Sequence, residues 1–175
     1  MGMLQFRAAD DSDTAVIVAL VESAYRGGAS RAGWTTEADL LDGQRIDIAG
    51  VREVIAKPQS RIVLAERQGQ IIGCVQLEKI DNHGYFGMFS VRPTEQGGGI
   101  GDALLREAER VVRDEFACTT MTCTVISIRA ELIAWYQRRG FRSTGEFKPF
   151  PYGDARFGLP KRDDLRFEVF AKAVL

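Results

Sequence analysis

The residues with the clearest capacity for chemistry lie in Gln96–Gly101, which reads Gln-Gly-Gly-Gly-Ile-Gly. The segment before it, Tyr85–Val91, is rich in aromatic and small apolar residues and predicts a buried strand. The segment after it repeats apolar residues at the helical period, which predicts an amphipathic helix. Amide groups at a helix N-terminus attract anions, and glycines let a phosphate approach the backbone closely. The pattern therefore predicts a loop that binds a pyrophosphate-bearing cofactor.

The spacing of this loop excludes two common phosphate-binding loops. A Walker loop ends in Gly-Lys-Ser/Thr, whereas Gly101 is followed by Asp102 and Ala103. A dinucleotide-binding fingerprint requires glycine at the position of Leu104. The spacing that fits is Gln-x-x-Gly-x-Gly, and the alternative is that the glycines only form a tight strand-to-helix turn.

A second motif lies downstream, in the string Tyr136–Phe141, which reads Tyr-Gln-Arg-Arg-Gly-Phe. It follows a strand predicted over Thr119–Ile126 and ends a predicted helix, with Gly140 as its C-terminal cap. The two motifs, in this order and on these elements, resemble the acetyl-CoA loop and the Tyr-x-x-x-Gly-Phe signature of the GCN5-related N-acetyltransferases. The resemblance covers about residues 62–175 and includes a final strand at Leu165–Phe170.

The resemblance implies an α/β (α+β) fold with a central mixed, mostly antiparallel sheet, flanked by helices on both faces. It implies one domain over residues 1–175 and acetyl-CoA as the co-substrate. The residues that it assigns to cofactor binding are Phe89, Ser90, Val91, Gln96, Gly97, Gly98, Gly99, Ile100, Gly101 and Asp102.

The remaining elements are predicted from periodicity and turn residues. They are an edge strand at Leu4–Arg7, a helix that includes Val16–Ala24, helices at Thr36–Leu41 and Arg52–Ala56, a hairpin of Arg61–Glu66 and Ile71–Glu78 turning at Gln68-Gly69, and a loop at Phe147–Pro160.

Bulk composition is that of one globular domain. The chain has 175 residues, 45% of them hydrophobic and 27% charged, with a net charge of −1. The charge argues against a general binder of nucleic acid or of a membrane surface. The odd number of cysteines, Cys74, Cys118 and Cys123, predicts buried thiols in a reducing compartment, so a cytoplasmic location is expected. No metal site is expected.

Direct transfer of an acetyl group to an amine requires four tasks. The amine must be bound and deprotonated, the carbonyl polarised and the departing thiolate protonated. The resemblance implies that Tyr136 protonates the thiolate, although it is also one more aromatic on an apolar stripe. A backbone amide near Phe89–Val91 is expected to polarise the carbonyl.

The general base stays open between three residues. Relatives that modify histones carry a glutamate at the position of Tyr85. His83 lies two residues earlier, on the same face of a regular strand, or belongs to the turn Asp81–Gly84. Glu78 is the third candidate, with an ordinary surface position as the alternative.

The resemblance places the acceptor pocket between the segments Tyr25–Arg45 and Phe147–Phe157. The candidate substrate-binding residues there are Trp34, Glu37, Arg45 and Tyr152. Acidic groups beside aromatics suit a cationic amine. The arginines of the first segment suit instead an acceptor that carries a carboxylate, so the acceptor stays open.

The function predicted first is acetyl-CoA-dependent N-acetylation of a primary amine on a small molecule. The alternatives are acetylation of a protein N-terminus or lysine, and an acyl-CoA-binding module without catalysis. By analogy with similar proteins, a homodimer is a candidate assembly, with Leu165–Phe170 taking part.

Overall fold

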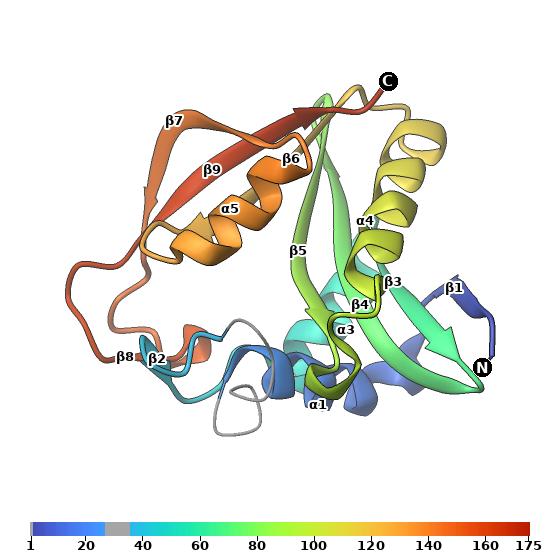
Figure 1. Ribbon diagram of the computed structural model, residues 1–175. Helices are drawn as coiled ribbons and strands as arrows, with labels where there is room; N and C mark the ends of the chain where they lie inside the picture. The colour runs from blue at the N-terminus through green and yellow to red at the C-terminus, as the bar shows by residue number, and fades with distance from the viewer. Residues whose placement is uncertain (1, 27–35) are drawn as a thin grey trace.

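The computed structural model describes residues 2–26 and 36–175 (Figure 1). Its strands are β1 (Leu4–Ala8), β2 (Leu41–Asp42), β3 (Ser60–Arg67), β4 (Gln70–Ile80), β5 (His83–Val91), β6 (Thr120–Ile126), β7 (Arg142–Pro149), β8 (Leu159–Pro160) and β9 (Arg166–Ala173). Its α-helices are α1 (Thr14–Tyr25), α3 (Ile48–Ala56), α4 (Ile100–Arg110) and α5 (Ala130–Arg138). Short 3-10 helices occupy Asp11–Asp13, Pro93–Glu95 and Ala155–Phe157, and a π-helical turn, Val111–Glu115, extends α4.

The main sheet has seven strands in the order β1-β3-β4-β5-β6-β9-β7. Neighbouring strands are antiparallel except β5 and β6, which run parallel. A small second sheet pairs β2 with β8. The fold class predicted from the sequence, a mixed and mostly antiparallel sheet, is confirmed.

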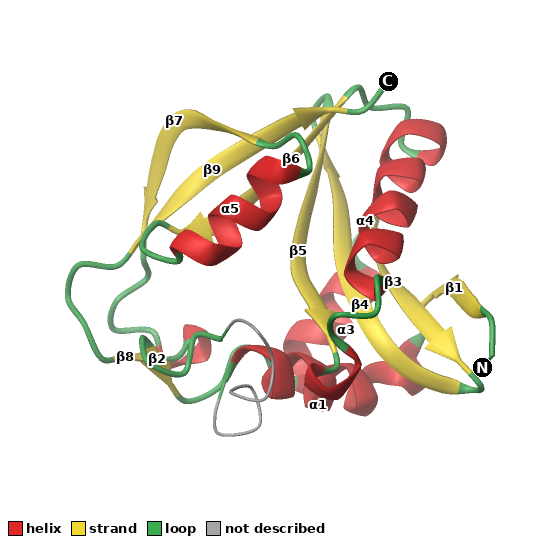
Figure 2. Cartoon of the chain, in the orientation of Figure 1, coloured by secondary structure: helices red, strands yellow, loops and turns green. Residues whose placement is uncertain are grey.

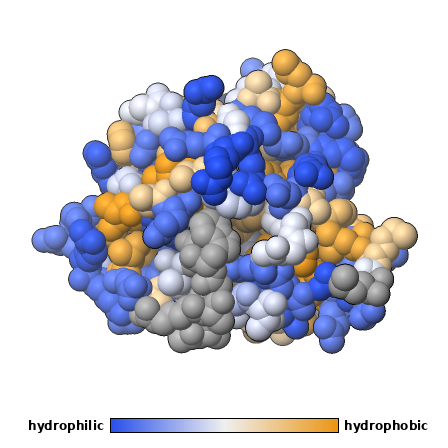
Figure 3. All heavy atoms as spheres, in the orientation of Figure 1, coloured by the Kyte–Doolittle hydropathy of each residue, from blue (hydrophilic) through white to orange (hydrophobic). Residues whose placement is uncertain are grey.

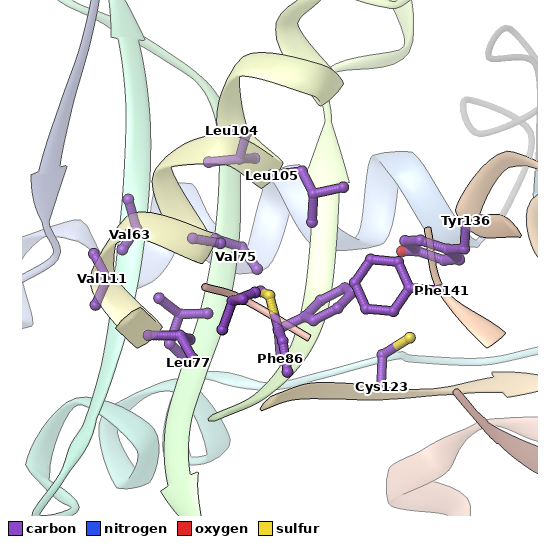
Figure 4. Close-up of a cluster of buried hydrophobic side chains, with 14 of the residues drawn as sticks. Val63, Val75, Leu77, Phe86, Leu104, Leu105, Val111, Cys123, Tyr136 and Phe141 are labelled. Atoms are coloured by element: carbon purple, nitrogen blue, oxygen red, sulfur yellow. The ribbon is translucent and has the colours of Figure 1, made fainter. Parts of the chain in front are cut away.

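Helices cover both faces of this sheet because β3 and β4 are apolar on both sides. Ile62 and Leu64 of β3 pack in one core cluster with Ile17 of α1. The alternate residue Val63 belongs to a second core cluster with Leu104 of α4 (Figure 4). Continuous apolar runs of this kind are typical of strands that are buried on both faces.

The sheet opens between β5 and β6. The two strands pair only from His83 to Tyr85 of β5 and from Thr120 to Thr122 of β6. Beyond these residues they diverge, and Figure 2 shows them close at one end and well apart at the other. On its other edge β5 bulges away from the β4 register near Met88, which has a positive φ of 49°. The sheet therefore contains a wedge-shaped gap at the carboxyl ends of β5 and β6.

Two sequence predictions differ from the structure. The helix predicted over Thr36–Leu41 is wrong, because this segment forms a turn in which Glu37 accepts from the amides of Leu40 and Leu41. Leu41 then enters β2. The strand β7 was not predicted, since its residues are all exposed and include Gly145.

The surface is mixed. Over its described part, the face in Figure 3 is mostly hydrophilic, with smaller hydrophobic areas between the polar ones. In the part of the chain that the structure describes, no helix is long and apolar enough to cross a membrane.

Candidate active site

The glycine loop begins the site. Gln96 follows a 3-10 turn, and its side-chain amide donates a hydrogen bond of 3.0 Å to the carbonyl of Val91 at the end of β5. Gly97 and Gly99 have positive φ values of 88° and 82°, and a Cβ added to either would meet nothing within 4 Å. Gly99 is the N-cap of α4. The first amides of α4 thus border open space, which is the arrangement that fits a phosphate group.

A cavity of about 380 Å³ lies over this loop and is called the loop cavity below. Of the residues predicted to bind the cofactor, it is lined by Phe89, Ser90, Val91, Gln96, Gly97, Gly99, Gly101 and Asp102. Ile100 instead packs in the core beneath the loop, and Gly98 is exposed outside the cavity. Most of the predicted cofactor residues therefore line one cavity, and Ile100 holds the loop to the core beneath it.

An arginine, Arg139, also lines the loop cavity. The Arg139 guanidinium lies 3.5 Å from the centre of the Trp135 ring and donates to the Asp102 carboxylate at 2.5 and 3.2 Å. This contact holds the pKa of Asp102 below its ordinary value. It ties the first turn of α4 to the end of α5. Arg138 lines the same cavity. Both arginines belong to the Tyr136–Phe141 string, but neither was predicted to bind the cofactor.

A second cavity of about 350 Å³ occupies the opening in the sheet and is called the gap cavity below. Residues of both diverging strands line it, including Tyr85 on β5 and Cys123 on β6. The residues that line both cavities are Tyr25, Phe89, Arg129, Leu132 and Tyr136. The two cavities therefore adjoin along one shared wall.

Tyr136 is central to that wall. It projects from α5 into an aromatic group that contains Phe86, Phe89 and Phe141, with ring centres 5.6 to 6.4 Å from its own (Figure 4). Its residue is only 4% exposed, and burial raises the pKa of the phenol well above 10. The hydroxyl makes no hydrogen bond to any residue that the structure describes. It is therefore a neutral donor that faces two cavities.

Charged residues also line the gap cavity. Glu37 is buried and pairs with two buried arginines, Arg26 at 2.9 Å and Arg129 at 3.0 Å. The guanidinium carbon of Arg45 lies 5.3 Å from the centre of the Tyr25 ring. The Tyr25 hydroxyl donates to the carbonyl of Phe89 at 3.0 Å, and burial raises its pKa to about 12. Glu37 and Arg45 were predicted as substrate-binding residues, whereas Arg26 and Arg129 were not in that set.

The other predicted residues take different places. Tyr85 lines the gap cavity, but His83 and Glu78 line neither cavity. His83 starts β5, at the closed end of the gap, and Glu78 pairs with Lys57 at 2.5 Å.

Tyr152 also lies outside both cavities. Its hydroxyl bridges the carbonyl of Arg162 and the amide of Leu165, at 3.0 and 2.8 Å. Trp34 lies outside the described residues.

The opened sheet, the glycine loop and the paired cavities agree with the acetyltransferase resemblance of the sequence. The model of the acetyltransferase (GNAT) family matches residues 30–141, which is more than half of the chain. The chain belongs to this family.

Two relatives illustrate how similar the sequence of this chain is to known proteins. The IAA acetyltransferase of Azospirillum brasilense is 34% identical over 105 residues, which are 56% of this chain and 65% of that protein. The amino-acid acetyltransferase of Azotobacter vinelandii is 32% identical over 107 residues, which are 60% of this chain and 24% of that protein. The chain thus spans less than two thirds of the length of each.

Solved structures show the same fold. The ribosomal-protein-S18-alanine N-acetyltransferase of Escherichia coli has a TM-score of 0.71 at 13% identity, covering 98% of this chain and 94% of its own. Mutant forms of the spermidine/spermine N-acetyltransferase SpeG of Vibrio cholerae have a TM-score of 0.67 at 15% identity, covering 97% and 93%. These identities support the fold alone.

Proposed function

We propose that this chain is an acetyl-CoA-dependent N-acetyltransferase that acts on a primary amine of a small molecule. The observation that carries the proposal is the shared wall of the two cavities. The glycine loop borders the loop cavity, and the gap cavity has the size of a small-molecule pocket. Tyr136 lines both cavities. A two-substrate transfer requires such an arrangement, in which donor and acceptor meet at one proton donor.

The loop cavity suits the donor. The open space over Gly97 and Gly99 and the first amides of α4 would hold the pyrophosphate. Acetyl-CoA supplies an activated acetyl thioester. The unpaired edge of β5 near Phe89–Val91 would orient the acyl arm and donate an amide to its carbonyl oxygen.

Tyr136 would act as the general acid. When the acceptor nitrogen bonds to the acetyl carbon, the carbon–sulfur bond breaks and the thiolate requires a proton. A neutral phenol that makes no hydrogen bond to the described residues can supply it. Water would return that proton, because the amine loses one in the same reaction.

The size of the gap cavity supports a small acceptor. The segment that follows β7 contributes Phe150 and Phe157 to its wall, which narrows the space for an extended peptide. Relatives named for amino acids support the same class of acceptor. The single seven-stranded sheet, with β1 and β7 at its edges, supports a single domain. A cytoplasmic location is proposed for it.

The test combines binding with turnover. Calorimetry should detect acetyl-CoA binding, and thiol release should appear with some members of a panel of small amines. Acetyl-CoA binding with turnover only on basic peptides would overturn the small-molecule acceptor. Absence of both binding and turnover would overturn the proposed function itself.

A further inference from the structure

The gap cavity has an unbalanced charge. Among the described residues that line it, three carry a guanidinium group, Arg26, Arg45 and Arg129, and only Glu37 carries a carboxylate. No lysine, histidine or aspartate is among them. The wall therefore has an excess of two positive charges in a partly enclosed space, where charge interactions are stronger than in water. Such a wall repels an acceptor that is only cationic.

The side chains of Glu37 and Arg26 already make hydrogen bonds within the protein. Both carboxylate oxygens of Glu37 accept from guanidinium groups, one from Arg26 and one from Arg129. Arg26 also donates to the carbonyls of Gln44 and Phe157, at 2.9 and 3.3 Å. The charge of Glu37 is therefore already compensated by two guanidinium groups, and Arg26 has a structural role.

Arg45 differs from both. It is half-buried, and its guanidinium pairs with no carboxylate in residues 2–26 and 36–175. The Glu22 carboxylate accepts from the backbone amides of Arg45 and Ile46, the second at 2.9 Å. The Tyr25 ring beneath the guanidinium is fixed by its hydrogen bond to Phe89. The guanidinium is therefore held at the cavity wall with donors available for a ligand.

We propose that the acceptor is a small amino acid whose carboxylate is bound by Arg45, with Arg129 adding positive charge beside it. This rests on the proposed N-acetyltransferase function. A guanidinium matches a carboxylate bidentately, which fixes orientation as well as affinity. With the carboxylate bound by Arg45, the amine would reach Tyr136, which lines the same cavity.

The rest of the cavity determines the side chain that the amino acid carries. Phe150, Phe157 and Phe167 line it, and the Phe150 and Phe167 rings lie 5.6 Å apart. A volume of about 350 Å³ is at the small end of ligand pockets. The proposed acceptor is accordingly a single amino acid with an apolar or aromatic side chain.

The first experiment compares acceptors on the unmodified protein. Thiol release from acetyl-CoA is measured with the twenty common L-amino acids and with spermidine. The best amino acid is then compared with its amide, in which the carboxylate is neutralised, and with the amine that lacks it. The expected kcat/KM for the acid exceeds that for either analogue by about 10- to 100-fold, and spermidine is not acetylated.

The second experiment tests Arg45 itself. Arg45→Gln should raise KM for the amino acid by about 10- to 100-fold, change kcat little, and leave KM for the amide within about twofold. Arg45→Lys should recover part of the loss, because it keeps the charge without the bidentate geometry. The control is Arg52→Gln, which removes an exposed arginine of α3 that pairs with Asp11 outside both cavities.

The outcomes separate this inference from the proposed function. Equal turnover of the acid and its amide, or turnover of spermidine alone, overturns the amino-acid acceptor and leaves an N-acetyltransferase. Acetyl-CoA binding with silence on every amino acid also overturns it. An unchanged KM in Arg45→Gln overturns the role of Arg45. Absence of acetyl-CoA binding to the unmodified protein overturns both proposals.

Discussion

Tyr136 is a buried residue that lines two cavities, and its hydroxyl makes no hydrogen bond to the described residues. A phenol in this position can donate a hydrogen bond or its proton to a ligand in either cavity. Removal of the hydroxyl should therefore affect chemistry more than folding.

Tyr136→Phe is expected to lower kcat by roughly 100-fold, because a general acid of this kind is lost. The dissociation constant of acetyl-CoA should stay within about twofold, since the ring and its aromatic contacts remain. Steady-state kinetics measure kcat, and calorimetry measures the dissociation constant. Because burial raises the pKa of Tyr136 well above 10, the unmodified enzyme should not lose activity between pH 8 and about 10 through this residue. An unchanged kcat in the variant would contradict the assignment.

For His83, unlike Tyr136, we expect a substitution to leave the activity unchanged. His83 lies at the closed end of the gap, where β5 and β6 still pair, and lines neither cavity. His83→Gln should therefore keep kcat/KM within about twofold and leave the pH profile unchanged. A fall in kcat/KM of roughly 100-fold or more in the variant would instead identify His83 as the base.

At the scale of the element, the role of the turn from β5 into α4 can be tested by comparing Gly99, which lies in that turn, with Gly69, which lies in another turn. Gly99 and Gly69 have similar positive φ values, 82° and 75°, and neither has an atom within 4 Å of an added Cβ. Gly69 lies in the β3–β4 turn, away from both cavities. Substitution by alanine should cost each protein about 1 kcal/mol of unfolding free energy.

Only Gly99→Ala should weaken acetyl-CoA binding, by about tenfold or more, because its Cβ enters the space proposed for the phosphates. Denaturant titration measures the shared loss of stability and calorimetry the difference in affinity. Equal affinity in the two variants would show that the loop is only a turn.

The elements also show what the sequence could predict. The glycine loop, α5 and the β3–β4 hairpin were predicted because their signals are local, in periodicity and turn residues. The segment 36–41 was predicted as a helix, yet long-range contacts determine it, since Lys161 donates to the carbonyls of Ala38 and Leu40. Likewise, the contact between Glu37 and Arg129 joins residues 92 positions apart, so no local pattern could reveal it.

At the scale of the molecule, the ion pairs of Glu37 hold the two sides of the gap together. They join the end of α1 to the start of α5 through two buried guanidinium groups. Glu37→Gln leaves these charges without a compensating carboxylate, which should cost about 3–5 kcal/mol and lower Tm by about 6–20 °C. Asp11→Asn, which breaks the exposed pair with Arg52, should cost less than about 1 kcal/mol. Similar losses in calorimetric scans of the two variants would contradict a structural role for the buried network.

The gap between β5 and β6 also determines how acetyl-CoA binding should change the stability and the hydrogen exchange of the whole molecule. From Phe86 onward, β5 has no strand partner on the side of β6, so amides on that edge depend on solvent or ligand. Acetyl-CoA at about one hundred times its dissociation constant should add about 2.7 kcal/mol of stability. Hydrogen exchange should slow at Phe89–Val91 and at Ile100–Asp102, and stay unchanged in β1, which is the outer strand on the other side of the sheet. Uniform slowing across the sheet would indicate stabilisation without contact at the gap, and would place the donor elsewhere.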